Sequence, residues 1–460
     1  MEQTKQNPLA TEPIGKLLLQ FSVPTVMTLL VNCLYNIVDQ IFVGHAVGIH
    51  GVAATNIAFP MITISAALAL MLGDGCAANI SLCLGKKEQQ QAEKILGNSF
   101  SLLLLFGIGL AIVVWVFCTS LAVLFGASEK VLGLSTMYMR ILALGLPFQM
   151  ANMTFTAIIR ADGNPKYAMK SMMMGAVINL VLDPVLIFGF DMGIIGAAIA
   201  TIIGQIVAGG ICFAYIRKFQ NITFAKQNMR LSWDTCKSIF CLGFPSLCMH
   251  TATALTQIVM NHLMRNYGAV TKYGSEMALS GYGMMMKTYQ VAHAMFVGVA
   301  SGTQPINGFN FGAKQYTRVM QTFRVAIVVS FVISGVWFLI FHFCGGMIGS
   351  WFVKNDPLYQ EFSAYCFRLY MMGFFVYGLP QVTASFFQAI GKPAKALATA
   401  LSRQIVFLIP LAILFSAKYG LTGALAAAPI ADILACVTAL AWIAQEYHIW
   451  RKNGFFTSKH

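Results

Sequence analysis

The sequence predicts an all-α polytopic membrane protein with twelve transmembrane helices in two pseudo-symmetric six-helix bundles. Its 460 residues are 58% hydrophobic and only 10% charged, with a mean hydropathy of +0.71. An average soluble domain has about 25% charged residues. Twelve mostly apolar runs are each long enough to cross a bilayer as a helix. Segments of the first half recur, in the same order, in the second half.

The apolar runs follow one another with short polar connections. They lie at 17–43, 52–84, 95–125, 131–160, 167–190, 193–216, 237–264, 276–311, 322–345, 359–390, 394–418 and 421–446. The second and eighth are long enough to continue into an interfacial segment. The first is too long for a cleaved signal peptide, so we expect the chain to insert through its own helices.

The positive charges predict the orientation in the membrane. Alternate connections hold 22 Lys and Arg on one side and five on the other, with Arg403 counted as a loop residue of the richer set. Because Lys and Arg accumulate in cytoplasmic loops, both termini are expected on the cytoplasmic side of a bacterial inner membrane. The basic residues are spread over these loops, so the net charge of +14 does not indicate a nucleic-acid partner.

The most polar connection, from Arg217 to Lys237, divides the chain into two halves of six runs. The predicted domains are an N-terminal lobe, a cytoplasmic linker, a C-terminal lobe and a cytoplasmic tail. They span residues 1–218, 219–236, 237–450 and 451–460, in that order.

Two sequence repeats relate the predicted lobes. Gly75–Lys87 matches Gly302–Lys314 at an offset of 227, and Gly193–Ala197 matches Gly420–Ala424 at the same offset. An even number of spans separates the copies, so the repeats are parallel and related by an axis along the membrane normal. Two facing lobes predict a cleft for a substrate, and we expect a monomer because they already enclose one pathway.

Several classes of chemistry are missing from the sequence. There is no GxxxxGK[ST] loop for ATP and no HExxH zinc motif. The 11 cysteines include no CxxC pair and mostly sit in apolar runs, which favours buried packing over a metal or disulfide framework. We therefore predict a protein that is not an enzyme, holds no cofactor, and runs any transport on a gradient of Na⁺ or H⁺.

The stretch from Asn179 to Pro184 is the strongest functional signal. An ionised side chain near the bilayer centre costs a few kcal/mol or more, so Asp183 needs a partner. Asn179 and Asp183 are four residues apart and share a helical face. Pro184 lacks an N–H and frees a backbone carbonyl one turn back. Three oxygen ligands are therefore expected at one depth, although a helix-end cap would explain Asp183 as well.

Two further side chains fall at a similar depth. At 1.5 Å per residue, Asp39 lies about 6 Å from the outer end of its run, Asp183 about 10 Å and Thr201 about 12 Å. Two carboxylates in one apolar cavity cannot both ionise without a compensating charge, so they are expected to bind a cation or to share a proton. Pro24, about 22 Å along the first run from Asp39, marks either a bend that responds to binding or a static kink.

Other polar and sulfur-containing residues are expected near the substrate cleft. Flexible methionines suit varied apolar ligands, although packing explains many of them equally well. The candidates are Met150, Met153, Met284, Lys287 and His293. Asp74 and Asp432 each appear alone in an apolar run, so a structural hydrogen bond is the expected role of both.

Taken together, these motifs resemble the multidrug and toxic compound extrusion (MATE) family over essentially the whole chain. The matching stretches are Pro24, Val38–Gly44, Arg160–Pro165, Asn179–Gly189 and Gly193–Thr201. The resemblance implies two six-helix bundles around a V-shaped cleft and antiport of organic cations against Na⁺ or H⁺. It also implies a cation or proton site at Asp39, Asn179, Asp183 and Thr201, with Tyr35 and Tyr138 as neighbours.

One departure from the family pattern concerns the C-terminal lobe. One branch of the family has acidic residues in spans seven and ten, whereas the stretches around Thr253 and Tyr377 contain none here. Ion coupling is therefore expected in the N-terminal lobe.

The predicted function is a secondary multidrug efflux antiporter whose partners are small cationic or amphiphilic molecules and membrane lipid. A flippase for lipid-linked precursors is the alternative within the superfamily, and it would need several basic residues in the cleft. Only Arg140, Lys287 and Arg368 fall within spans. A receptor or sensor without transport is the alternative from another class. Such a protein would need neither repeated lobes nor paired carboxylates.

Overall fold

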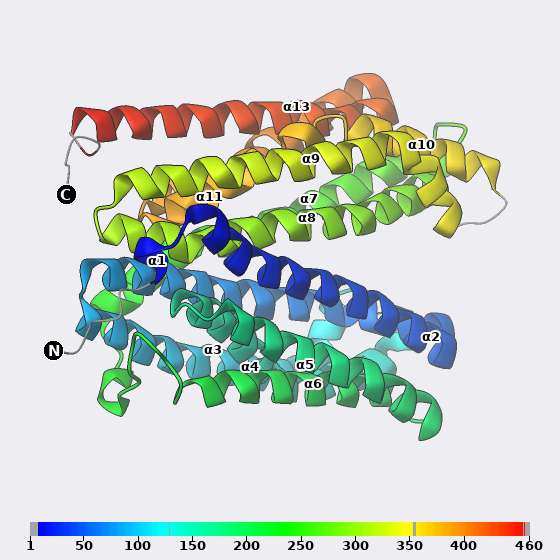
Figure 1. The fold of residues 1–460 in the computed structure, drawn as a ribbon. Helices are drawn as coiled ribbons and strands as arrows, with labels where there is room; N and C mark the ends of the chain where they lie inside the picture. Colours follow the sequence, from blue (N-terminus) through cyan, green and yellow to red (C-terminus); the bar gives the residue numbers. More distant parts are fainter. Residues whose placement is uncertain (1–7, 128, 353–355, 454, 456–460) are drawn as a thin grey trace. The chain divides into compact units, whose positions relative to one another are not determined.

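The computed structural model describes residues 8–127, 129–352, 356–453 and 455, and every regular element in this part is a helix (Figure 1). The predicted tail at 451–460 is described only at 451–453 and 455. The elements are α1 Pro8–Thr11, α2 Ile14–Lys86, α3 Gln89–Leu124, α4 Glu129–Ala161, α5 Pro165–Pro184, η1 Val185–Gly189, α6 Gly193–Tyr215, η2 Lys226–Met229, α7 Trp233–Gly268, α8 Gly274–Gly312, α9 Tyr316–Phe352, α10 Pro357–Tyr370, η3 Phe374–Val376, α11 Gly378–Ala389, α12 Pro393–Leu401, η4 Ser402–Leu408 and α13 Ile409–Lys452.

Two of these elements each contain more than one membrane pass. Figure 1 shows that α2 runs out and returns, with its two apolar segments at Ile14–Tyr35 and Ala53–Lys86. The second element is α13, which ends the apolar segment Pro393–Lys452 and is broken at Gly420. Gly420 has a φ of 60° and a ψ of −139°, angles that only glycine adopts readily.

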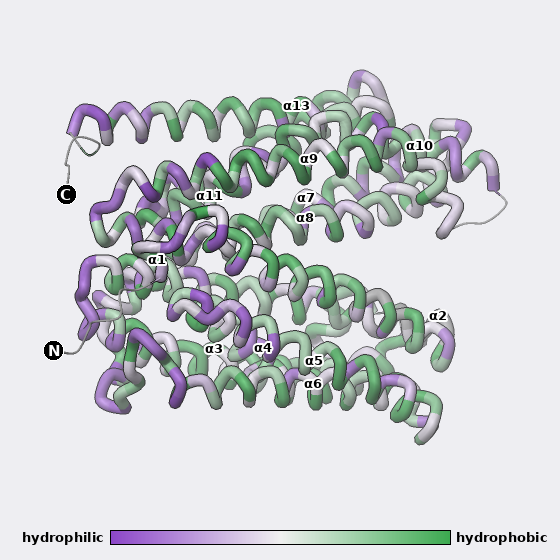
Figure 2. The backbone as a smooth tube through the Cα atoms, in the orientation of Figure 1, coloured by the Kyte–Doolittle hydropathy of each residue, from purple (hydrophilic) through white to green (hydrophobic). Residues whose placement is uncertain are grey.

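Nine segments of the described residues can cross a membrane by length and composition. The Gly420 break divides one of them, and α8 and the α10–α11 passage add two more, which brings the helical passes to the predicted twelve. In Figure 2 the hydrophobic residues occupy the middle of the long helices, and the hydrophilic residues gather at helix ends and connections. The predicted fold class, an all-α polytopic membrane protein, is confirmed.

The chain divides into two compact units. The first, here the N unit, comprises Met1–Ala10, Val23–Leu247 and Gly312–Lys314. The second, the C unit, comprises Thr11–Ser22, Cys248–Phe311 and Gln315–His460. The long helix α7 contributes to both units. The predicted domain boundaries at residues 218 and 237 follow the sequence repeat rather than contacts, and they stay a prediction.

Local sequence signals set where helices begin in both units. Asn164 caps α5 by accepting a hydrogen bond from the backbone N–H of Tyr167 at 3.2 Å, and Pro165 occupies the first turn. Asp356 caps α10 through the N–H of Tyr359 at 3.0 Å, again followed by proline. Both follow the usual order of a polar cap and then a proline whose missing N–H is not needed.

A buried carboxylate fixes the turn between α4 and α5. Asp162 accepts hydrogen bonds from the Tyr215 hydroxyl and from the backbone N–H groups of Gln220 and Asn221, each at 2.9 Å. These contacts fasten the end of α4 to the end of α6 and to the segment after it. They therefore hold α4 and α6 together at this end.

Candidate functional site

Two glycines bring α5 and α6 close together. A Cβ at Gly204 would lie 2.7 Å from the backbone oxygen of Gly175 and 3.2 Å from the Cβ of Asn179, so no larger residue fits without moving a helix. Helices pack at the closest separation when small residues line the contact. This approach places the side chain of Asn179, on α5, against α6.

The amide of Asn179 links the two helices at this level. Its Nδ2 donates to Asp183 Oδ1 at 3.3 Å and to Thr201 Oγ1 at 3.4 Å. The Thr201 hydroxyl in turn donates to the Ala197 carbonyl at 2.9 Å. The π-helix η1 begins directly after Pro184, and π-helical turns occur frequently at functional sites. These hydrogen bonds bring the side chains of Asn179, Asp183 and Thr201 together, and their common depth in a membrane stays a prediction.

Asp39 on α2 completes the cluster within the N unit. Its carboxyl group and that of Asp183 are close enough to interact directly. Tyr138 on α4 is buried and lies near both carboxyl groups and near Tyr35. Four helices thus contribute to one polar site inside an apolar bundle.

The site contains more acceptor oxygens than donors. Asp39 Oδ1, Asn179 Oδ1 and Asp183 Oδ2 are buried and have no hydrogen-bond partner within the described residues. The three residues are 8%, 3% and 1% exposed. A buried oxygen without a partner loses its hydration at a cost of about 1–3 kcal/mol. Oxygen clusters of this kind are the ligands that hard cations prefer, and a proton on one carboxyl would relieve the same imbalance.

Pro24 lies inside α2, where it is buried and lines a small pocket of the N unit with Thr28 and Arg160. The Thr28 hydroxyl donates to the Pro24 carbonyl at 2.7 Å. The helix continues through this residue, so the proline is a potential bending point within a continuous helix.

The predicted cleft residues have different surroundings. Met150 and Met284 are buried in apolar clusters of their units, and Met153 packs partly buried against the first of these. Packing accounts for all three methionines. Lys287 is exposed on α8. His293 is half-buried, and its Nδ1 lies 2.9 Å from the Tyr377 hydroxyl.

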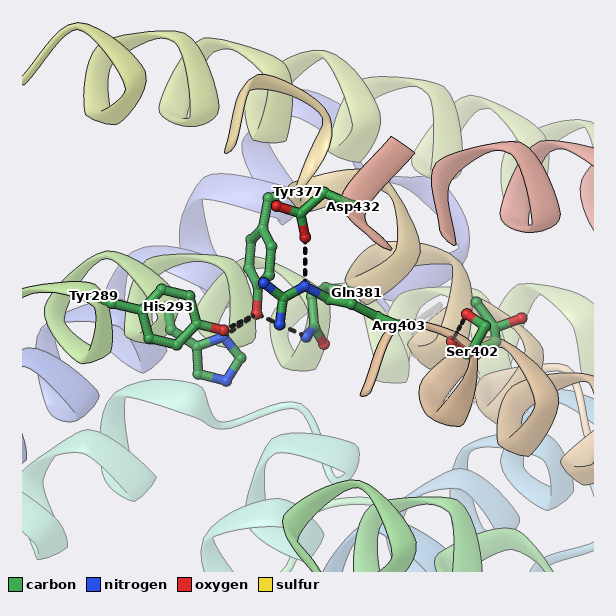
Figure 3. A network of polar contacts seen from close by, with 8 residues as sticks. Tyr289, His293, Tyr377, Gln381, Ser402, Arg403 and Asp432 are labelled. Carbon is green, nitrogen blue, oxygen red and sulfur yellow. Dashed lines mark hydrogen bonds and ion pairs between the residues drawn. The ribbon is translucent and has the colours of Figure 1, made fainter. Parts of the chain in front are cut away.

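His293 belongs to a polar network of the C unit that the sequence analysis missed (Figure 3). The Tyr377 hydroxyl contacts the Tyr289 hydroxyl at 2.6 Å and accepts from Gln381 Nε2 at 3.2 Å. The Arg403 guanidinium lies over the Tyr377 ring, 4.8 Å from its centroid, and its Nε donates to Asp432.

The structure contradicts two expectations. Asp432 is not alone, since it forms a buried ion pair with Arg403. Arg403 is not a loop residue, because it lies in η4, within the apolar segment Pro393–Lys452. Its inclusion in the cytoplasmic charge count was wrong. Asp74 is also bonded, and it accepts from the Ser246 hydroxyl at 2.7 Å, as expected for a structural hydrogen bond.

Comparisons with known proteins agree with this architecture. The MatE family model matches residues 24–185 and 252–414. The multidrug export protein MepA of Staphylococcus aureus (strain MRSA252) is 26% identical over 437 residues, which is 93% of each chain. MepA of Staphylococcus saprophyticus is 27% identical over 431 residues, again 93% of each chain.

Solved structures share the fold. An outward-facing multidrug resistance MATE family transporter of the MOP superfamily has a TM-score of 0.90 at 22% identity and covers 98% of this chain and 100% of its own. A MOP superfamily transporter from Pyrococcus furiosus, described as having a binding pocket of reverse polarity, has the same score and identity with full coverage of both chains.

Proposed function

Because the chain belongs to the MatE family of transporters, we propose that it is a secondary active antiporter that exports organic cations or amphiphiles in exchange for Na⁺ or H⁺. The similarity to proteins named for multidrug export supports the direction of transport. The proposal includes a bacterial inner-membrane location, cytoplasmic termini and a monomer that works alone.

The unpartnered oxygens of Asp39, Asn179 and Asp183 carry the proposal. Two carboxyl groups that interact directly in an apolar bundle strongly disfavour double ionisation, because like charges repel and neither is hydrated. One bound Na⁺ or one proton removes this penalty. In the proposed cycle, the Na⁺ or proton enters the site from the outer side of the membrane. It leaves when the site opens to the opposite side.

Asn179 and Thr201 are proposed as positioning residues of this ion site. The Asn179 amide donates to Asp183 and Thr201, which leaves its own oxygen free for the cation. Asp39 lies on α2, the same helix as Pro24, so binding of a cation or proton at Asp39 can change the shape of α2. Bending at a proline that lacks one helical hydrogen bond is the simplest way for α2 to respond.

Vesicle transport tests the proposal. Purified full-length protein is reconstituted into liposomes, and uptake or release of a fluorescent organic cation is followed with an imposed Na⁺ gradient, an imposed pH gradient, or neither. We expect transport of the dye with one of the two gradients and no transport without a gradient. The variant Asp183→Asn should abolish the gradient-driven transport. Asp191→Asn is the matched control, because Asp191 is an exposed carboxylate just after η1. Gradient-driven transport by Asp183→Asn at the rate of the unmodified protein would overturn the proposal.

A further inference from the structure

We propose that the protein binds an anionic phospholipid at two equivalent places, one on each unit, through Arg140 of α4 and Arg368 of α10. The inference goes beyond the proposed function and does not depend on the coupling ion. Both arginines fall within apolar runs, and both side chains are exposed. Neither takes part in the carboxylate cluster of the N unit or in the polar network of the C unit.

The two arginines occupy the same position in the internal sequence repeat. They are 228 residues apart, and each lies 11 residues after the first residue of its helix, Glu129 for α4 and Pro357 for α10. Identical residues keep this offset on both sides of the arginines: Ser135 and Ser363, Gly145 and Gly373, Gly163 and Gly391, Pro165 and Pro393. Each unit therefore presents the same basic group at the same distance along the same helix of the repeat.

Each arginine is held by the preceding long helix of its own unit. Arg140 Nε donates to Cys118 Sγ on α3 at 2.9 Å, and Arg368 Nε donates to the His342 carbonyl on α9 at 3.3 Å. Among the residues that the structure describes, neither guanidinium makes a further hydrogen bond or an ion pair. A guanidinium has five N–H donors, so the four on Nη1 and Nη2 remain for a ligand. They form a planar fork that matches two oxygens of a phosphate.

The surface near each guanidinium is apolar. Exposed apolar side chains within one helical turn of the arginine or next to its partner in the sequence are Phe117, Met137 and Leu144 in the N unit and Phe343 and Met372 in the C unit. Such a surface on a membrane helix is covered by lipid tails. A free anion would have to enter this apolar layer alone, whereas a phospholipid supplies both the phosphate and the tails.

The depth of both groups fits the boundary between lipid tails and headgroups. Helices α3 and α9 have 36 and 37 residues. At 1.5 Å per residue they exceed the roughly 30 Å hydrocarbon layer by about 12 Å at each end, if the excess is shared equally. Cys118 lies about 9 Å before the end of α3, and His342 about 15 Å before the end of α9, so both partners lie within about 3 Å of the boundary.

The direction of the two side chains also favours a headgroup. Side chains of a helix point back toward its N-terminus, and α4 and α10 both begin at the nearby membrane surface. Long basic side chains in such places extend toward the headgroups. In the proposed orientation this surface is the outer one, where basic loop residues are few. The two arginines therefore offer an uncompensated positive charge to a headgroup of the outer leaflet.

The test counts lipids bound to the purified full-length protein. Native mass spectrometry from detergent follows titration with dioleoylphosphatidylglycerol or dioleoylphosphatidylethanolamine. These lipids share tails and a phosphate, but the second adds an ammonium group that a guanidinium repels. We expect two sites that bind phosphatidylglycerol about tenfold or more tightly than phosphatidylethanolamine. Arg140→Met and Arg368→Met should each remove one site, and the double variant should remove both.

Matched variants keep the inference falsifiable. Lys287→Met should leave both sites intact, because Lys287 is an exposed basic residue of an apolar run whose position in the other repeat is Pro60. If the methionine variants do not fold, Arg140→Lys/Arg368→Lys keeps the charges without the fork and should weaken binding by about threefold to tenfold.

Three results would overturn the inference. They are equal binding of the two lipids, unchanged phosphatidylglycerol binding by either double variant, and displacement of the lipid by excess inorganic phosphate, which would indicate a site for free anions. Because binding is measured without a gradient, each of these results would leave gradient-driven export untouched.

Discussion

The buried ion pair between Arg403 and Asp432 predicts strong energetic coupling between two residues that lie far apart in the sequence. Their side chains are 8% and 1% exposed. Replacing either partner alone leaves the other charge buried without its counterion, which typically costs about 3–5 kcal/mol. Replacing both by apolar residues of similar size is often nearly neutral, so Arg403→Met/Asp432→Leu should lie within about 1 kcal/mol of the unmodified protein. A double-mutant cycle of these variants is therefore expected to give a coupling energy of several kcal/mol.

The assay is a double-mutant cycle in mixed micelles, with unfolding by increasing fractions of SDS followed by tryptophan fluorescence. Lys272 and Glu361 form the matched control pair, with side chains 59% and 54% exposed, and its cycle should show no measurable coupling. Additive effects of Arg403→Met and Asp432→Leu would refute the reasoning, because they would mean that the two charges do not depend on each other.

Three further predictions concern the geometry of the N unit. Asn179→Ala should weaken binding of the coupling cation by about tenfold in isothermal titration, and unchanged affinity would contradict the positioning role. Gly204→Val should destabilise the protein by about 1–3 kcal/mol in SDS titration, since its Cβ would meet the Gly175 oxygen at 2.7 Å; a neutral effect would mean that α5 and α6 separate freely. Asp162→Ala should lower stability by about 1–3 kcal/mol by removing the acceptor of the Tyr215 hydroxyl and two backbone N–H groups, whereas Asp162→Asn should lose less.

Much of the fold could be predicted from the sequence because each bilayer crossing requires a long apolar run. The α5–α6 part of the N-unit cluster could also be anticipated. Asn179 and Asp183 share a helical face by spacing alone, and Thr201 falls at the same depth on the next helix. The structure brings these three side chains together through hydrogen bonds, and their role in coupling stays a prediction.

The C-unit network could not be predicted in the same way. Arg403 and Asp432 are on different helices, so no spacing rule connects them. Arg403 also sits near the start of its apolar run, where a basic residue is normally a loop residue. The π-helix that turns Arg403 and Gln404 inward breaks the 3.6-residue period on which facing arguments depend. The signal available in the sequence was a basic residue, Arg403, inside one apolar run and an isolated Asp432 in the next.

Equilibrium binding of the coupling cation tests the central claim most directly, because it asks whether Asp39 and Asp183 hold one positive charge between them. Titration of purified protein with Na⁺, at several pH values and with proton release followed by a pH indicator, should give one cation per chain, with Na⁺ and H⁺ competing for it. Asp39→Asn and Asp183→Asn should each abolish the site, and the double variant should behave like either single one. A cation bound with unchanged affinity and stoichiometry by Asp183→Asn would contradict the account.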